Sequence, residues 1–405
     1  MLENGVVHLS AIGGFGNVYL IRKFPVLFNS DLASKFKVVS VADIYDEERL
    51  KDRKSIDDLF EEIKSSRIKE KELKPEIEKS LYILKGKLLD RSLPYFQLNK
   101  DSPVIPYELF GLFDRLDGNA VVDVSAPNKY HLSLAEQVLR RNVSLLLEKP
   151  AVISSREADE LGILLRSSNL NGTKLIDAEH YSHYGNVRYY IDHFESYISQ
   201  FGKVTGMELS IREDEDFSSG RNRETVERSK SGGGIWLDTG IHIMAFLRNI
   251  GAGIDWNSAE VQPYKSLDKD IQDAKYGETR MDVELDVKEE KNFSKNCHVK
   301  ASVGKSFAKK DKSKCFVVYH INGKVEMDIV TKELRVYDKK NEEYLLQSSK
   351  PFEEDAFYNV FRDLHECITQ DVAPLTSLSK ALDNVRDVFR VYDKAGSKLI
   401  MGDYN

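Results

Sequence analysis

The first twenty residues of the chain constrain its fold most strongly, because they have the pattern of a strand, a glycine turn and the start of a helix. Residues 6–12 are largely apolar, residues 13–17 read Gly-Gly-Phe-Gly-Asn, and apolar residues resume directly afterwards. Gly14 and Gly16 match the first two glycines of G-x-G-x-x-G, a turn whose backbone N–H groups bind a pyrophosphate at a helix N-terminus. Tyr19 stands at the third glycine position. A lone glycine turn is often only a tight loop, so the rest of the chain has to supply the context.

A second apolar strand, 37–42, ends at Asp43, which follows Gly16 by 27 residues (43 − 16). In dinucleotide-binding folds an acidic residue roughly 20 residues beyond the glycines binds the ribose 2′-hydroxyl. Residues 46–48 are also acidic and Arg49 is the only cation nearby, so a 2′-phosphate would be repelled. The pattern therefore favours NAD over NADP as the cofactor. The alternative is a carboxylate in an ordinary strand-to-loop turn.

Two further apolar runs, 120–124 and 143–147, have the pattern of buried parallel strands, with a helix expected between them at 132–139. The second run leads directly into Glu-Lys-Pro, whose lysine is Lys149. Ligands of such sheets lie beyond the carboxyl ends of the strands, so Lys149 is expected to point toward the cofactor crevice. A solvated lysine at a strand tip is the alternative. The charged, helix-rich stretch 50–116 is predicted to be an insertion, either a lid or an oligomer contact.

Residues 232–242 read GGGIWLDTGIH and place a carboxylate and an imidazole within a largely apolar segment. A helix is predicted from Ile235 onward, and Asp238 and His242 would share one of its faces because they are four residues apart. A buried carboxylate and imidazole need partners, so the two side chains are expected to bind each other or a ligand. A purely structural hydrogen bond between them is the alternative.

Composition excludes several classes of protein. The formal net charge of −7 argues against a nucleic-acid binder or a protein held on anionic membrane. The three cysteines are far apart and lack metal-ligand spacing, so neither a disulfide framework nor a metal site is expected. No apolar run approaches the roughly 18 residues of a membrane span, and no signal peptide is recognised. We expect a cytoplasmic protein.

Four stretches in this order resemble the glucose-fructose oxidoreductase, inositol dehydrogenase and rhizopine-catabolism oxidoreductase family: 13–17, 126–131, 148–150 and 232–242. The resemblance implies an α/β protein in two domains. A Rossmann domain with a doubly wound parallel sheet would occupy 1–150, and an α/β domain with a large open mixed sheet would occupy 151–405.

The same resemblance implies a set of functional residues. Lys149, Asp238 and His242 would line the substrate site, and the Lys149–Pro150 peptide would be cis. Homodimers or homotetramers would form through the exposed face of the second sheet. The residues expected to bind the cofactor are Gly14, Phe15, Gly16, Asn17, Asp43, Ala126, Pro127, Asn128, His131, Glu148 and Lys149.

The second domain is predicted to start with a strand at 174–178, followed by a segment, 179–184, rich in groups that bond hydroxyls. This segment weakly resembles the histidine-tyrosine stretch of glucose-6-phosphate dehydrogenases. His180, Tyr181 and Arg188 are therefore candidate substrate-binding residues, with a buried aromatic cluster as the alternative. Alternating patterns predict strands of one sheet, residues 214–228 are expected to form a loop over the site, and a closing amphipathic helix is predicted at 379–394. The predicted strands are 204–211, 281–287, 297–303, 315–320, 323–329 and 333–337.

The sequence thus predicts an NAD-dependent oxidoreductase that acts on a secondary alcohol of a sugar, a sugar phosphate or a cyclitol. His242 is expected to be the general base, Asp238 its orienting partner, and Lys149 the cation that stabilises a developing alkoxide. Two alternatives stay open. The first is a regulator that binds a dinucleotide without turnover, and the second is an enzyme that retains its cofactor and moves hydride between two sugars.

Overall fold

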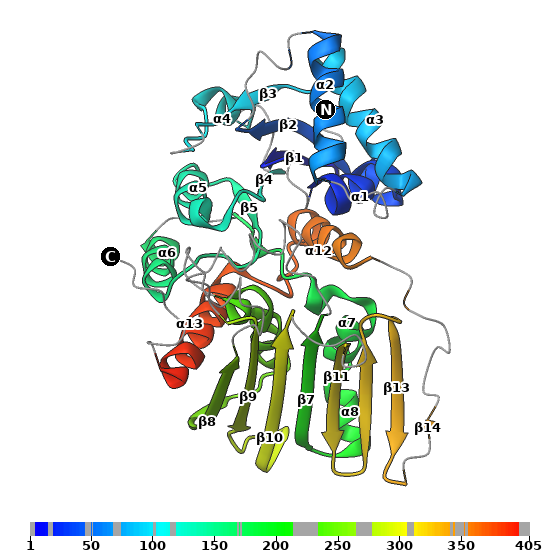
Figure 1. Ribbon diagram of the computed structural model, residues 1–405, viewed down its shortest axis with the longest axis vertical. Coiled ribbons are helices and arrows are strands. Elements are labelled where there is room, and N and C mark those ends of the chain that lie inside the picture. The colour runs from blue at the N-terminus through cyan, green and yellow to red at the C-terminus, as the bar shows by residue number, and fades with distance from the viewer. Residues whose placement is uncertain are drawn as a thin grey trace. The chain divides into compact units, whose positions relative to one another are not determined.

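The computed structural model describes residues 5–14, 19–44, 50, 52–67, 74–99, 103–113, 119–167, 170, 172–213, 234–264, 278–305, 312–340, 343–344, 352 and 355–396. The chain divides into two compact units (Figure 1). Unit 1 comprises Met1–Val152, Glu160–Ala178 and Phe357–Ser379, and unit 2 comprises Ile153–Asp159, Glu179–Ala356 and Lys380–Asn405. No helix within the described ranges is both long and apolar enough to span a membrane.

Unit 1 is built on a parallel sheet with six strands among the described residues, in the order β3-β2-β1-β4-β5-β6. This order is that of the dinucleotide-binding Rossmann fold, and the predicted doubly wound parallel sheet is confirmed. The central strand β1 is buried along its whole length, which explains its continuous apolar pattern. The strands are β1 (Val7–Ile12), β2 (Phe36–Asp43), β3 (Tyr95–Gln97), β4 (Ala120–Val124), β5 (Ser144–Leu147) and β6 (Leu175–Asp177).

Two predictions about this sheet need correction. Strand β6 was expected to open the second domain, but Leu175 pairs in parallel with Leu145 of β5, so this assignment is wrong. The stretch 50–116 is not only an insertion, because its residues Tyr95–Gln97 form the edge strand β3 beside β2. The apolar stripe predicted within that stretch lies on α3 (Pro75–Leu89), where Ile77, Leu81, Leu84 and Leu88 are buried in the core of unit 1.

Helices flank this sheet and complete the core of unit 1. The chain leaves the glycine turn through a π-helical segment, η1 (Tyr19–Lys23), and a short helix, α1 (Phe24–Asn29), which begins at the proline-containing Phe-Pro pair. The other helical elements are η2 (Asp31–Ser34), α2 (Arg53–Arg67), α4 (Tyr107–Phe113), η5 (Asn128–Tyr130), α5 (His131–Leu139), α6 (Ser155–Ser167, shared between the units) and α12 (Ala356–Gln370).

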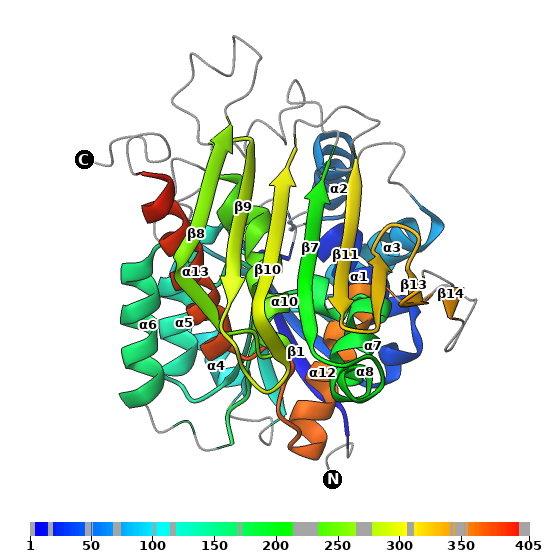
Figure 2. The ribbon, with the colours of Figure 1, turned by 90° about the horizontal axis from the view of Figure 1, so that it is seen from below.

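Unit 2 is built on a mixed sheet with eight strands among the described residues, in the order β14-β13-β12-β11-β7-β10-β9-β8 (Figure 2). Strands β10 and β7 are parallel and the other pairs are antiparallel, so the predicted open mixed sheet is confirmed. The strands are β7 (Val204–Arg212), β8 (Ile254–Tyr264), β9 (Arg280–Val287), β10 (Phe293–Gly304), β11 (Ser313–His320), β12 (Gly323–Asp328), β13 (Glu333–Asp338) and β14 (Glu343–Tyr344).

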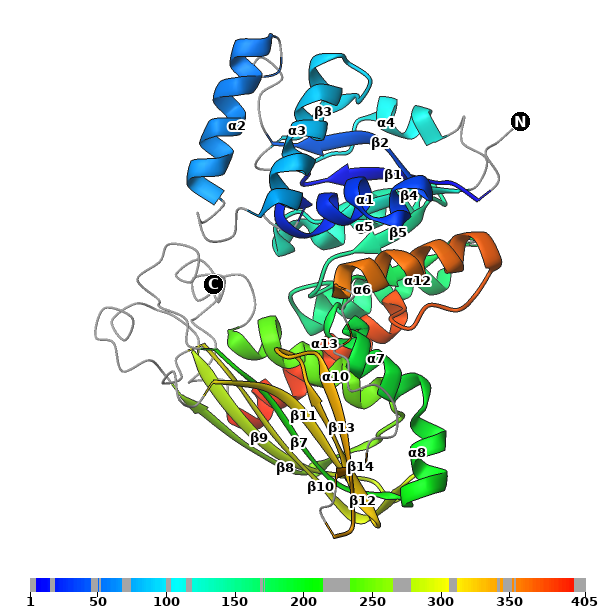
Figure 3. The same ribbon diagram turned by 90° about the vertical axis from the view of Figure 1, so that its right-hand side faces the viewer.

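The helices of unit 2 cover one face of this sheet (Figure 3). Alternation along the strands explains the arrangement, since Met207, Leu209 and Ile211 of β7 are buried and Glu208 between them is exposed. The closing helix predicted at 379–394 is α13 (Leu378–Ala395). The remaining helical elements are η6 (Tyr181–His183), α7 (Gly185–Asp192), α8 (Phe194–Phe201), η8 (Trp236–Gly240) and α10 (Ile241–Asn249). The predicted loop at 214–228 lies outside the described residues.

Candidate functional site

The glycine turn of unit 1 lies at the carboxyl end of β1 and is packed too closely for side chains. Gly13 has a positive φ of 77°, and a Cβ there would lie 2.7 Å from the carbonyl oxygen of Ser125. A Cβ on Gly14 would lie 2.5 Å from a methyl group of Val41. Both glycines are therefore required by the close approach of β2 and the end of β4 to the turn. The predicted cofactor residues Phe15, Gly16 and Asn17 lie outside the described residues.

Asp43 is the last residue of β2 and is almost fully buried. Its Oδ1 atom accepts a hydrogen bond of 2.7 Å from the backbone N–H of Ile44, and its carbonyl oxygen accepts one of 3.0 Å from the Tyr95 hydroxyl. The structure thus places this carboxylate at the carboxyl end of the strand next to β1, where the sequence predicted it. The acidic residues at 46–48 lie outside the described residues.

A buried ionic cluster joins the end of η1 to β4 and to the residue that follows β5. Lys23 is fully buried, and its Nζ atom lies 2.8 Å from Asp123 Oδ1, 2.8 Å from Ser125 Oγ and 3.1 Å from Glu148 Oε1. Burial alone would lower the pKa of Lys23, but the charges of Asp123 and Glu148 outweigh it and raise that pKa. Tyr19 is also fully buried and reaches the Asp123 carbonyl oxygen at 3.5 Å, so the third glycine position is filled by a packed aromatic ring.

The loop after β5 is held next to the loop after β4 by the His131 side chain. The Lys149–Pro150 peptide is cis, as the family resemblance implied. His131 is fully buried, and its ring nitrogens lie 2.8 Å from the carbonyl oxygens of Pro150 and Ala126. Glu148 belongs to the Lys23 cluster, and its Oε2 atom lies 3.3 Å from the Lys149 N–H. His131 therefore links the two loops through their backbones. Pro127 and Asn128 lie between Ala126 and His131 in the sequence, at the start of η5.

In unit 2, His242 and Glu179 form a buried pair. Glu179 follows β6, and its Oε1 atom accepts a hydrogen bond from Nδ1 of His242. The same carboxylate accepts hydrogen bonds of 2.9 Å from the N–H groups of Tyr181 and Ser182. Burial alone would raise the pKa of Glu179. The hydrogen bond and charge of His242 and the hydrogen bonds of Ser182 outweigh burial and lower that pKa below its ordinary value. Glu179 was not among the residues predicted from the sequence, and Asp238 was expected to be the orienting partner of His242.

Aromatic groups surround the imidazole, as the 179–184 segment suggested. The Tyr181 ring stacks on His242 with centroids 4.0 Å apart, and the His180 ring meets it edge-on at 5.0 Å. Two of the candidate substrate-binding residues thus lie against His242. The third, Arg188, lies on α7 and forms an ion pair of 2.7 Å with Asp192.

Asp238 forms an ion pair with Lys305, a residue that was not predicted from the sequence. Its Oδ2 atom lies 3.2 Å from Nζ of Lys305, which directly follows β10 and is nearly buried. Glu213, directly after β7, pairs with Lys314. Burial raises the pKa of Tyr181 well above its ordinary range, and the charges of Glu213 and Asp238 add to that effect. These charged pairs and the Glu179–His242 pair therefore belong to one polar region of unit 2.

The start of the helix that carries Asp238 and His242 is capped by two residues distant in sequence. The Tyr392 hydroxyl accepts hydrogen bonds from the N–H groups of Gly234 (2.9 Å) and Leu237 (3.0 Å). Glu278 Oε1 accepts one from Trp236 N–H (3.0 Å) and one from the Tyr392 hydroxyl (2.9 Å). These bonds satisfy donors that a helix leaves unpaired at its first turn. They also explain the last glycine of the run, because a Cβ on Gly234 would lie 2.2 Å from the Glu278 carboxylate.

The free energy of unfolding should depend on the ionisation of Glu278. Burial raises its pKa from 4.5 to about 7, against the lowering effect of its hydrogen bonds. Because the pKa is higher in the folded protein than in the unfolded chain, the contribution of Glu278 to stability is present below pH about 4.5 and is lost as pH rises to about 7. At about 1.36 kcal/mol per pKa unit, the loss is on the order of 3 kcal/mol.

We expect Glu278→Gln to remove this loss, because the amide keeps the acceptor for Trp236 and Tyr392 and cannot ionise. Urea unfolding at pH 5 and pH 8 measures the effect. From pH 5 to pH 8 the wild type should lose unfolding free energy relative to the variant. An equal difference at both values would contradict the raised pKa of Glu278.

Comparison with known proteins agrees with this architecture. No family model and no curated protein sequence matches the chain. Levoglucosan dehydrogenase in complex with NADH and levoglucosan is 12% identical, with a TM-score of 0.66 over 97% of this chain and 98% of that one. Aldose-aldose oxidoreductase from Caulobacter crescentus is 14% identical, with a TM-score of 0.66 over 97% and 98%. An oxidoreductase from Thermotoga maritima is 17% identical, with a TM-score of 0.66 over 98% and 100%.

The chain has the fold of these oxidoreductases. The likeness covers nearly the full length of each chain, so it includes both the parallel sheet of unit 1 and the mixed sheet of unit 2. The fold expected from the family resemblance is therefore confirmed.

Proposed function

We propose that the protein is an NAD-dependent oxidoreductase that oxidises a secondary alcohol of a sugar, a sugar phosphate or a cyclitol. The observation that carries this proposal is the buried Glu179–His242 pair, which gives unit 2 an oriented base next to aromatic and hydroxyl-binding groups. Among the solved structures with this fold, levoglucosan dehydrogenase was crystallised with NADH and its sugar.

The residues of unit 1 fit a dinucleotide. Gly13 and Gly14 form a turn that side chains would fill, and Asp43 ends the neighbouring strand β2. The turn would hold the pyrophosphate through backbone N–H groups, and the Asp43 carboxylate would accept hydrogen bonds from the adenosine ribose. When bound, the nicotinamide ring supplies the hydride chemistry.

Proton movement would belong to residues of this chain. Because Nδ1 of His242 is bonded to Glu179, we propose that Nε2 accepts the proton of the substrate hydroxyl. The Glu179 carboxylate would hold the ring in that tautomer and stabilise the imidazolium that forms, as the carboxylate does in a catalytic triad. Asp238, held by Lys305, would accept a hydrogen bond from a neighbouring substrate hydroxyl. Lys149 would stabilise the developing alkoxide.

A screen of sugars, sugar phosphates and cyclitols for NAD reduction tests the proposal, with absorbance of the nicotinamide as the readout. A saturable rate with at least one of these alcohols is expected. NADH binding without turnover on any of them would favour the non-catalytic regulator. Nicotinamide absorbance that stays with the purified protein through gel filtration would favour the enzyme that retains its cofactor.

Cofactor choice gives a separate prediction that depends on Asp43. The wild type should prefer NAD, because the buried carboxylate at the end of β2 repels a 2′-phosphate. Asp43→Ala should reduce this preference by about tenfold, the effect of losing roughly 1.4 kcal/mol. The ratio of kcat/KM for NAD and NADP measures it, and Asp31→Ala, at an acidic position away from the strand ends, is the control. A wild type that works faster with NADP at equal concentrations would show that Asp43 has another role.

A further inference from the structure

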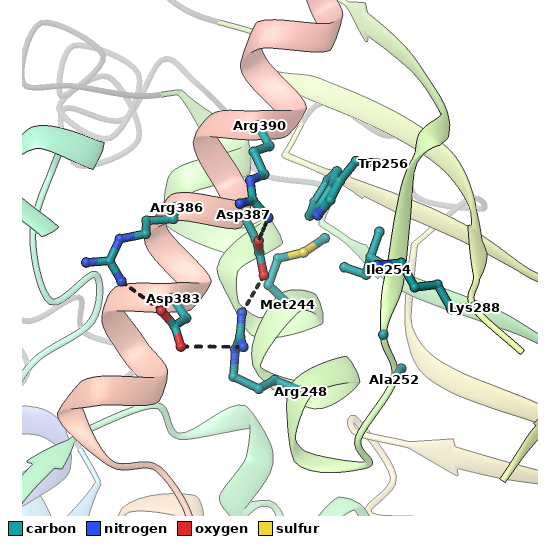
Figure 4. Close-up of a pocket in the computed structure, with 11 residues that line it drawn as sticks. Met244, Arg248, Ala252, Ile254, Trp256, Lys288, Asp383, Arg386, Asp387 and Arg390 are labelled. Atoms are coloured by element: carbon teal, nitrogen blue, oxygen red, sulfur yellow. Dashed lines mark hydrogen bonds and ion pairs between the residues drawn. The ribbon is translucent and has the colours of Figure 1, made fainter. Parts of the chain in front are cut away.

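Helix α13 holds both ends of the helical segment 236–249, which comprises η8 and α10 and carries the proposed base. At the end of the segment, the Arg248 guanidinium forms ion pairs with Asp387 and, at 3.6 Å, with Asp383 of α13 (Figure 4). At its start, the Tyr392 hydroxyl of α13 accepts hydrogen bonds from backbone N–H groups. The residues of α13 that contact the end of the segment come earlier in the chain than Tyr392, so the two helices run antiparallel.

Four consecutive N–H groups at the start of this segment, those of residues 234–237, bond to Glu278 or Tyr392. Two bond to the Tyr392 hydroxyl, one bonds to Glu278 Oε1, and that of Ile235 lies 3.4 Å from the Glu278 carbonyl oxygen. The Tyr392 hydroxyl also donates to Glu278 Oε1 at 2.9 Å, so its proton and both of its lone pairs are used. These two residues, the cap of the segment, therefore set the direction in which it starts.

Both residues of the cap are buried, so water cannot take their place. Tyr392 is 3% exposed and Glu278 is 2% exposed. Without the Tyr392 hydroxyl, two backbone N–H groups would lose their acceptor, and an unsatisfied buried donor costs more than the bond contributes. The start of the segment would therefore move toward other acceptors. Asp238 directly follows Leu237, one of the two donors, and His242 lies one turn later, so both side chains would be displaced.

The turn that follows the cap is π-helical and contains Asp238. Single π-helical turns inside helices are rare and occur mostly at functional sites. The cap contacts this turn directly, because the N–H group of Trp236 bonds to Glu278 at 3.0 Å. The Trp236 ring in turn packs on Gly240, where a Cβ would lie 2.4 Å from it. Cap, indole ring and glycine therefore fix the turn through which the chain passes from Asp238 to His242.

We propose that α13 positions Asp238 and His242 for the reaction, through Tyr392 and its partner Glu278. Tyr392 and Glu278 are then positioning residues, which act through the start of the helix and not on the substrate. The proposal rests on the proposed function, because it assigns a role in that reaction to the cap of the helix that carries the base. A cap that only stabilises unit 2 would give different results in the two measurements that follow.

The first measurement uses Tyr392→Phe in the full-length protein, which removes the hydroxyl and keeps the ring. At a temperature at which circular dichroism shows the variant folded, kcat/KM for the alcohol should fall by about 10- to 100-fold, because small displacements of reacting groups cost this much. NADH affinity should stay within about twofold, since the proposed dinucleotide residues belong to unit 1. Glu278→Gln keeps the acceptor for Trp236 and Tyr392, so it should retain both values. Tyr197→Phe, which removes a buried hydroxyl of α8, is the matched control.

The second measurement is a proton NMR spectrum, which reports the position of His242 without turnover. A proton on imidazole Nδ1 that is bonded to a buried carboxylate exchanges slowly with water and resonates downfield of the backbone amides. His242→Gln identifies this resonance by removing it. Tyr392→Phe should shift or broaden the resonance, because movement of the helix changes the distance from Nδ1 to Glu179. The Glu278→Gln variant and the control variant should leave it in place.

The two measurements separate positioning from stabilisation and from failure of the proposed function. The proposal is overturned if folded Tyr392→Phe keeps both the resonance and kcat/KM, if it loses NADH affinity as well, or if Tyr197→Phe has the same effects. If Tyr392→Phe does not fold, Arg248→Lys loosens the other end of the segment, and unchanged values of both quantities would overturn the proposal. If the wild type oxidises none of the alcohols, the proposed function fails, and the resonance alone decides whether Tyr392 positions His242.

Discussion

His242→Ala should lower turnover by a factor of about 10² to 10⁴ and leave NADH affinity close to that of the wild type. The factor is the usual loss when a positioned general base is removed. Cofactor affinity should be retained because the glycine turn and Asp43, which are proposed to bind the dinucleotide, belong to unit 1, and His242 belongs to unit 2. Steady-state kinetics with a substrate found in the screen and fluorescence titration with NADH measure the two quantities.

Two variants separate the chemical role of His242 from a structural one. His242→Ala leaves the buried Glu179 carboxylate with two backbone donors and no imidazole, so it also costs stability. His242→Gln can still donate a hydrogen bond to Glu179, so it should lose turnover and keep its melting temperature. His193→Ala, which removes an exposed histidine of the same unit, is the control and should keep both.

Glu179→Gln tests what the carboxylate contributes to the Glu179–His242 pair. The amide can accept the Nδ1 hydrogen bond but has no charge to stabilise the imidazolium, so turnover should fall and the acid limb of the kcat/KM profile should move to lower pH. A purely structural Glu179 would change the melting temperature and leave the pH profile in place. If His242→Gln retains full activity, the proposed base must be sought elsewhere in the chain.

The sequence predicted elements whose pattern is local and strong. Continuous apolar runs predicted β1, β2, β4 and β5, and alternating patterns predicted six strands of the second sheet. Strand β3 was missed because its three residues are partly exposed and lie in a charged stretch. Strand β6 was placed in the wrong unit because an apolar run does not reveal which strand it pairs with. That choice depends on Leu145, thirty residues earlier (175 − 145).

Partners that are distant in the sequence also limited the prediction of the candidate site. The GGGIWLDTGIH stretch located His242 and Asp238, but their partners come from elsewhere in the chain. Glu179 is 63 residues from His242, and Tyr392 is 114 residues from Glu278. One signal was available for Glu179, because it is an acidic residue two positions after the end of the parallel strand β6, where ligand-binding residues of such sheets gather. The ends of β7 and β10, where Glu213 and Lys305 lie, carried no comparable pattern.

Lys23→Met should reduce the free energy of unfolding by about 3 to 5 kcal/mol, the usual cost of removing one partner from a buried ion pair. The substitution leaves the carboxylates of Asp123 and Glu148 buried without their cation. It also removes the link between η1, which follows the glycine turn, and the ends of β4 and β5. NADH affinity should therefore fall together with stability. Urea unfolding and NADH titration measure the two effects, and Lys37→Met, at an exposed position of β2, is the control.

A second substitution distinguishes an uncompensated charge from lost packing. Asp123→Asn in the Lys23→Met background removes one of the two buried carboxylates, so it should recover part of the lost stability, because the penalty comes from charge without a partner. Lowering the pH should also narrow the difference in unfolding free energy between Lys23→Met and the wild type, because burial raises the pKa of Asp123 and protonation neutralises that carboxylate in the variant. If Lys23→Met costs less than about 1 kcal/mol, or if Asp123→Asn adds to its cost, then Lys23 stabilises unit 1 by packing and not by compensating buried charge.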